Sequence, residues 1–195
     1  GIEAARQASV QGFKGQIKKG KLTEEQAAAK VEEILSLITG TLDYDGFGDV
    51  DFVIEAVPER IDIKQAIFQQ LDAVTPSHAI LATNTSALSI DEIGEATTRP
   101  DKVVGFHYFY PAFMMPLVEV IGTQWTSPAV IDFTMKLHAD AGKMPAHVKK
   151  DVPGFIGNRL QHAPWRAAIS LVESGICDAV TVDKVIKAAV GRRLA

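Results

Sequence analysis

The chain has 195 residues, 47% of them hydrophobic, which is enough for one sizeable core or for one complete domain plus part of a second. Its formal net charge of −4 has the wrong sign for a binder of nucleic acid. A single cysteine excludes an intrachain disulfide and a thiolate metal site, and no apolar run approaches the length of a membrane span. We therefore expect a cytoplasmic protein that binds neither nucleic acid nor membrane. One local basic cluster lies near the start, at Lys14, Lys18, Lys19 and Lys21.

The first residues are helical in character, and a clear helix follows over 23–39. Thr23 and Gln26 have the spacing of a capping box at its start, and Gly40 is expected to end it. Residues 52–57 form a continuous apolar run, which predicts a strand buried on both faces.

Helical and strand-like segments then alternate. The expected elements are a helix over 58–74, a strand over 79–86, a short helix over 89–97, strands over 102–108 and 116–122, a helix over 127–142 and a strand over 144–148. This alternation predicts an α/β fold with a Rossmann-type, mainly parallel sheet. Two helices without further strands follow, over 154–175 with an interruption at Pro164, and over 181–191. We expect an α/β domain over 1–149 and an all-helical domain over 150–195.

Polar side chains gather at the predicted strand ends, where the ligand crevice of an open α/β sheet lies. The turn over 55–64 could offer backbone N–H groups to a nucleotide, or it could be a solvated helix start with an exposed lysine. The segment over 83–86 could present a hydroxyl and an amide to a substrate, or it could only order its own turn. Asn158 has apolar neighbours, so its amide could be buried against a substrate carbonyl, whereas such an asparagine is usually a cap or exposed.

His107 and Glu119 are the strongest candidates for proton chemistry. An imidazole can accept a proton near neutral pH when a carboxylate holds its second nitrogen in the right tautomer. Glu119 lies within an apolar strand, where a glutamate needs a partner, unless the strand is a half-exposed edge and the carboxylate is on its wet face. The other four histidines show no ligand-like spacing, which predicts that the chain has no metal site.

Five segments occur together in the chain: VIEAVPE, TNTSALSI, GFHYFYP, MPLVEVI and DVPGFIGNRL. In order and spacing they resemble the NAD-dependent L-3-hydroxyacyl-CoA dehydrogenase family, and the resemblance covers essentially the whole chain. It implies a Rossmann domain, a helical domain that forms a homodimer, NAD as cofactor and an acyl-CoA as substrate. The implied reaction oxidises the 3-hydroxyl of a (3S)-3-hydroxyacyl-CoA to the 3-oxoacyl-CoA, as in fatty acid beta-oxidation or butanoate metabolism.

The resemblance also implies roles for individual residues. The general base would be His107, oriented by Glu119, while Ser86 would bond the substrate oxygen and Asn158 would complete the catalytic group. The positions that contact the cofactor in the family correspond here to Glu59, Lys64, Asn84 and Ser86. The positions that contact the substrate correspond to Ser86, Asn158 and Lys19, the last in the region that holds the CoA moiety.

The chain departs from the family pattern in two respects. The strand and glycine-rich phosphate loop that open the family's domain are absent, and the chain ends where the helical domain would continue, so we expect a central fragment that is inactive alone. Tyr110 replaces the asparagine of most members. Two other functions stay open. One is a dehydrogenase of a free 3-hydroxy acid, of the carnitine, gulonate or lambda-crystallin kind, to which NRLQHA is similar, and the other is a noncatalytic relative.

Overall fold

The computed structural model describes residues 2–194, and its centre is a five-stranded sheet in the order β1-β2-β3-β4-β5. The strands are β1 (Phe52–Glu55), β2 (Ile80–Asn84), β3 (Val103–Tyr108), β4 (Leu117–Gly122) and β5 (Met144–Val148). Neighbouring strands are parallel except β3 and β4, which are antiparallel. The expectation of a mainly parallel, Rossmann-type sheet is therefore confirmed.

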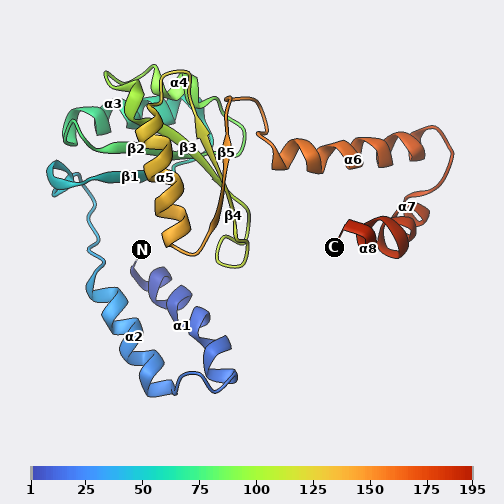
Figure 1. The fold of residues 1–195 in the computed structure, drawn as a ribbon, viewed down its shortest axis with the longest axis horizontal. Helices are drawn as coiled ribbons and strands as arrows, with labels where there is room; N and C mark the ends of the chain where they lie inside the picture. The colour runs from blue at the N-terminus through green and yellow to red at the C-terminus, as the bar shows by residue number, and fades with distance from the viewer. Residues whose placement is uncertain (1, 195) are drawn as a thin grey trace.

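Helices cover both faces of this sheet (Figure 1). They are α3 (Ile61–Val74) and α4 (Ile90–Gly94) on one face and α5 (Pro128–Asp140) on the other. Phe68 of α3 and Ile90 of α4 pack on Leu81 and Val103, while Val130 of α5 packs on the opposite face with Phe106. Each strand in the middle of the sheet is consequently buried on both sides, as long apolar runs in such sheets require.

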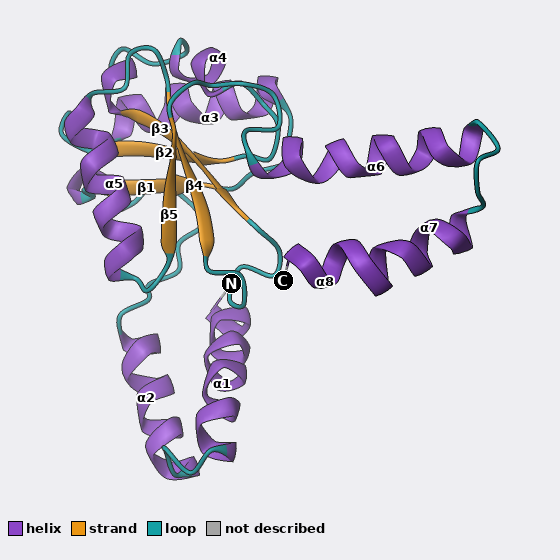
Figure 2. Cartoon of the chain, turned by 45° about the vertical axis from the view of Figure 1, so that its right-hand side comes forward, coloured by secondary structure: helices purple, strands orange, loops and turns teal. Residues whose placement is uncertain are grey.

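The first two helices, α1 (Ile2–Lys18) and α2 (Glu24–Ser36), form a hairpin that extends away from the sheet (Figure 2). The capping box is confirmed, because Thr23 accepts from the Gln26 N–H and the Gln26 side chain accepts from the Thr23 N–H. The sequence predicted that this helix continues until Gly40 ends it, but it ends at Ser36. Its last buried side chain is Leu35, and a helix without an apolar face to bury gains little from continuing.

The segment around β1 corrects two further expectations. The strand ends at Glu55 and does not continue to residue 57. It is also not buried on both faces, because it is the edge strand that pairs only with β2 within the described sheet, and Ile54 is 53% exposed. Helix α3 begins at Ile61, so Pro58 and Glu59 lie in the preceding turn and not in the helix. The Glu59 carboxylate instead accepts hydrogen bonds from the turn after β2, which keeps this residue out of the helix.

Only helices follow β5 in the described part of the chain. They are α6 (Gly157–Glu173), α7 (Ala179–Val185), a π-helical turn (Ile186–Val190) and α8 (Gly191–Leu194). Pro164 was expected to interrupt the first of these, but α6 continues through it, because a proline removes one intrahelical hydrogen bond and can bend a helix without ending it. Among residues 2–194 no helix is long and apolar enough to cross a membrane.

Candidate active site

His107 and Glu119 face each other across the antiparallel pair β3 and β4. They are directly opposed in the strand register, so their side chains project from the same face of the sheet. The His107 Nδ1 lies 2.8 Å from the Glu119 Oε2, and the two residues are 5% and 1% exposed. Because β4 lies between β3 and β5, the alternative of a carboxylate on the wet face of an edge strand is wrong.

The second oxygen of Glu119 is held by the start of helix α6. Its Oε1 accepts hydrogen bonds from the backbone N–H groups of Ile156 and Gly157, each at 2.9 Å. Free N–H groups at a helix N-terminus favour a negative charge, and bonds to a carboxylate are stronger than neutral ones. Both carboxylate oxygens are thus satisfied, and the carboxylate is fixed between the sheet and α6.

This arrangement determines the tautomer of His107. An ionised carboxylate can only accept hydrogen bonds, so the proton lies on Nδ1, which donates to Glu119, and Nε2 is left as the acceptor nitrogen. Among the described residues no protein group bonds Nε2. The ring is flanked by Phe109 and Phe155, with centroid separations of 4.6 and 5.7 Å. Gly157 makes room for this packing, because a Cβ at that position would lie 2.3 Å from the Phe109 Cζ.

Ser86 and Asn158 come together although they are far apart in the sequence. The Asn158 Nδ2 donates to the Ser86 backbone carbonyl at 3.1 Å, and the hydroxyl-bearing Ser86 is exposed. Asn158 is half-buried, which lies between the buried and the exposed alternatives, and its partner in this structure is a protein carbonyl. Since Asn158 directly follows Gly157, which bonds Glu119, the four predicted catalytic residues gather around the start of α6.

Glu59 fixes the turn that carries Ser86. Its Oε1 accepts from the Thr85 hydroxyl at 2.5 Å and from the backbone N–H groups of Ser86 and Ala87 at 2.8 and 3.2 Å. Partial burial raises the pKa of Glu59, but the Thr85 and Ser86 hydrogen bonds, the nearby Lys64 charge and the Ala87 bond outweigh it and lower this pKa overall. The Glu59 carboxylate therefore holds the backbone of the turn at residues 85–87 and is at the same time a hydrogen-bond acceptor beside the strand ends.

Lys64 is fully buried, so the alternative of an exposed lysine is wrong. Its Nζ lies 2.8 and 2.9 Å from the two Glu55 oxygens, 2.9 Å from the Asn84 carbonyl and 3.7 Å from the Glu59 Oε2. The predicted contact of Lys64 with a cofactor stays a prediction. Sequence reasoning missed Glu55, although a charged residue at the end of an apolar strand was a usable signal.

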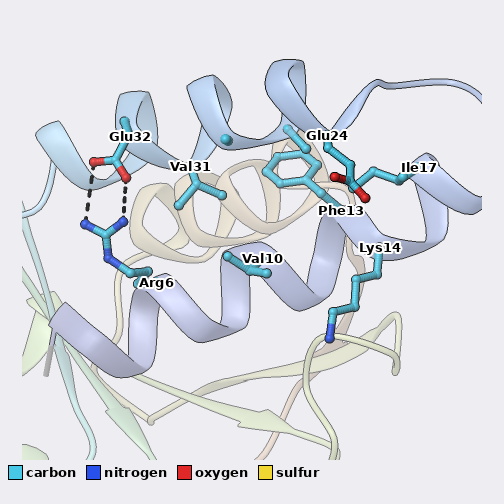
Figure 3. A pocket seen from close by; sticks show the side chains of 10 residues that line it. Arg6, Val10, Phe13, Lys14, Ile17, Glu24, Val31 and Glu32 are labelled. Carbon is cyan, nitrogen blue, oxygen red and sulfur yellow. Dashed lines mark hydrogen bonds and ion pairs between the residues drawn. The ribbon is translucent and has the colours of Figure 1, made fainter.

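Two predicted features lie apart from this group. Lys19 lies just after α1, exposed at the end of the helical hairpin. The groove between α1 and α2 is a separate cavity of about 360 Å³ that is lined largely by apolar side chains (Figure 3). Tyr110 is 96% exposed and precedes Pro111 through a cis peptide bond. Among the described residues no group of three or more histidine, cysteine and acidic side chains could hold a metal ion.

A mainly parallel sheet with helices on both faces, followed by further helices, is the architecture of a Rossmann-type domain, and a buried histidine–carboxylate pair joins two of its neighbouring strands. The model of the 3-hydroxyacyl-CoA dehydrogenase NAD binding domain matches residues 1–152, and that of the 3-hydroxyacyl-CoA dehydrogenase C-terminal domain matches 154–195. The chain belongs to the 3-hydroxyacyl-CoA dehydrogenase family.

Individual relatives agree with this assignment. The chain is 42% identical to a glyoxysomal fatty acid beta-oxidation multifunctional protein of Brassica napus over 89% of its own length and 23% of that protein. It is 41% identical to a 3-hydroxybutyryl-CoA dehydrogenase of Clostridioides difficile over 80% of its length and 55% of that enzyme. The solved (S)-3-hydroxybutyryl-CoA dehydrogenase of Ralstonia eutropha superposes with a TM-score of 0.83 at 33% identity, over 93% of this chain and 62% of that one. The chain thus spans about a quarter to just over half of these curated relatives' length.

Proposed function

We propose that the protein containing this chain oxidises the 3-hydroxyl of a (3S)-3-hydroxyacyl-CoA to the 3-oxoacyl-CoA with NAD, as in fatty acid beta-oxidation or butanoate metabolism. The observation that carries the proposal is the His107–Glu119 pair, whose carboxylate is bonded on one side by the ring and on the other by two backbone amides. A buried carboxylate needs hydrogen-bond partners in any case. What supports a general base is that this fixed carboxylate holds His107 in one tautomer, with Nε2 as the acceptor.

His107 removes the hydroxyl proton in this mechanism. Its Nε2 accepts the proton while Nδ1 donates to Glu119, and the imidazolium that results is stabilised by the carboxylate. The Ser86 hydroxyl bonds the substrate oxygen and Asn158 completes the group around it, which limits the orientations in which that oxygen meets Nε2. Phe109 and Phe155 exclude water from the ring.

The residues at the strand ends fit a dinucleotide. β1, β2 and β3 are parallel and end side by side, which is where such sheets bind nucleotides. The Glu59 carboxylate keeps 41% of its side chain exposed, and Ser86 presents a hydroxyl beside the half-buried Asn84, so acceptors and donors for ribose hydroxyls and a carboxamide are available. These three residues would hold the cofactor together with Lys64. NAD supplies the two-electron acceptor for the carbon that is oxidised.

The acyl-CoA substrate is favoured by the lysines of the helical hairpin. Lys18, Lys19 and Lys21 are all exposed at one end of it, and a cluster of positive charge attracts the phosphates of CoA. A free 3-hydroxy acid offers no such phosphates. We also propose that the NAD-binding domain ends at residue 149 and the helical domain begins at residue 150. The enzyme is proposed to be cytoplasmic. Both statements follow the expectations from the sequence.

We also propose that the helical domain forms a homodimer. Large apolar side chains are exposed along α6 and α7: Leu160, Trp165, Ile169, Val172, Val180 and Val185. Monomeric proteins rarely expose a contiguous apolar surface of this kind. A second copy that contributes the same helices would bury it by symmetry.

The test is the oxidation of NADH by the whole natural protein with acetoacetyl-CoA, run beside acetoacetate at equal concentration. We expect turnover with acetoacetyl-CoA, a much lower kcat/KM with acetoacetate, and a loss of about 10²- to 10⁴-fold in kcat for His107→Ala. Preference for acetoacetate would favour the free-acid alternative. Absence of turnover with both substrates, or equal turnover by His107→Ala, would refute the proposed function.

A further inference from the structure

A buried ion pair lies beneath the turn that carries Ser86. Glu55 ends β1 and Lys64 lies in α3, and neither is accessible to solvent to any important degree. Both Glu55 oxygens accept from the Lys64 ammonium, while Oε2 also accepts from the Thr83 hydroxyl at 2.7 Å and Oε1 from the Val57 N–H at 2.5 Å. A charge pair taken out of water stabilises a fold little, so its presence at the strand ends suggests another purpose.

The ammonium is shared between this pair and the turn that carries Ser86. Besides Glu55 it donates to the Asn84 carbonyl, two residues before Ser86, and it lies 3.7 Å from the Glu59 Oε2. Glu59 in turn holds the Ser86 and Ala87 N–H groups through its other oxygen, and the Ser86 carbonyl receives the Asn158 amide. The position of this turn therefore depends on where one ammonium group lies.

We propose that Glu55 is a positioning residue for the active site: it holds the Lys64 ammonium away from Glu59, so that Glu59 stays on the turn of residues 85–87. The argument rests on the proposed function for its catalytic consequence. If Glu55 is made neutral, Glu59 is the nearest remaining anion to Lys64. An unpaired buried ammonium is costly, so the Glu59 carboxylate moves toward it and releases the two backbone N–H groups.

The test is Glu55→Gln in the whole natural protein, with Asp72→Asn as the matched control. Asp72 forms another largely buried ion pair, 2.8 Å from Arg99, at the end of α3 remote from the strand ends that carry Ser86. Both variants are expected to lower the unfolding temperature. Only Glu55→Gln is expected to lower kcat, by about tenfold or more, and to speed hydrogen exchange at the Ser86 and Ala87 amides, measured by mass spectrometry or NMR.

A double-variant comparison separates positioning from general weakening of the fold. In a Glu59→Gln background the turn has already lost its carboxylate, so adding Glu55→Gln is expected to change kcat less than twofold. An equal fold-loss in both backgrounds, or exchange at Ser86 and Ala87 that matches the Asp72→Asn control, would overturn the proposal. The exchange readout needs no catalysis. A wild-type protein without turnover would therefore refute the proposed function and leave the exchange prediction to be decided separately.

Discussion

Replacing Glu119 by glutamine tests the tautomer argument directly. The carboxylate accepts three hydrogen bonds, one from the His107 Nδ1 at 2.8 Å and two from the N–H groups of Ile156 and Gly157 at 2.9 Å. A glutamine amide has one acceptor oxygen and one donor nitrogen. If its oxygen stays on the two backbone amides, its NH₂ group faces Nδ1, which must then become the acceptor. The proton moves to Nε2, and His107 can no longer act as a base.

The magnitude follows from what is lost. Loss of general base catalysis costs about 10²- to 10⁴-fold in kcat, which is about 3 to 5 kcal/mol at about 1.36 kcal/mol for each factor of ten. Neutralising the acceptor of two buried hydrogen bonds at a helix N-terminus also costs about 1–3 kcal/mol of unfolding free energy. We expect Glu119→Gln to fold with a lower unfolding temperature, to bind substrate, and to lose at least a hundredfold in kcat.

The assay is NADH oxidation with acetoacetyl-CoA, with unfolding followed by circular dichroism. His138→Gln is the control, since His138 is another buried histidine. Unlike His107, it has protein partners at both nitrogens, the Tyr108 hydroxyl at 2.9 Å and the Thr134 carbonyl at 2.8 Å. It packs on the sheet face opposite α3 and is expected to lose stability while its kcat changes little. A kcat for Glu119→Gln within a few-fold of wild type would refute the tautomer argument.

Three further predictions follow from the geometry. Because the pKa of Glu59 is lowered on folding, its stabilising effect is present above its ordinary value of 4.5 and is lost as pH falls through the lower, folded value. The difference in unfolding free energy between wild type and Glu59→Gln should therefore shrink in unfolding curves recorded at pH values below 4.5. Lys19→Gln should raise KM for acetoacetyl-CoA about two- to fivefold at low salt, with no change for Lys136→Gln or for acetoacetate. Gly157→Ala should displace Phe109 from the His107 ring, which should lower the unfolding free energy by about 1–3 kcal/mol and also lower kcat. A kcat equal to that of wild type would contradict this packing.

Periodicity along the sequence was sufficient for most of the elements. Buried parallel strands and amphipathic helices leave patterns within a few neighbouring residues, and the capping box at Thr23 is a local signal that the structure confirms. Helix boundaries were predicted less well at Ser36 and Ile61. There the end of the helix depends on whether apolar side chains find a surface, or on a distant acceptor such as Glu59, and neither is visible in a local window.

The sequence by itself, through polar residues beside apolar strands and through its resemblance to a family, named His107, Glu119, Ser86 and Asn158 as candidates. Only the tertiary structure decided how they meet. The pairing of β3 with β4 sets His107 opposite Glu119, and the return of α6 to the sheet supplies the backbone amides for the carboxylate. The same packing made Lys64 the buried partner of Glu55 and not the exposed lysine of a solvated helix start, because α3 folds back over the end of β1.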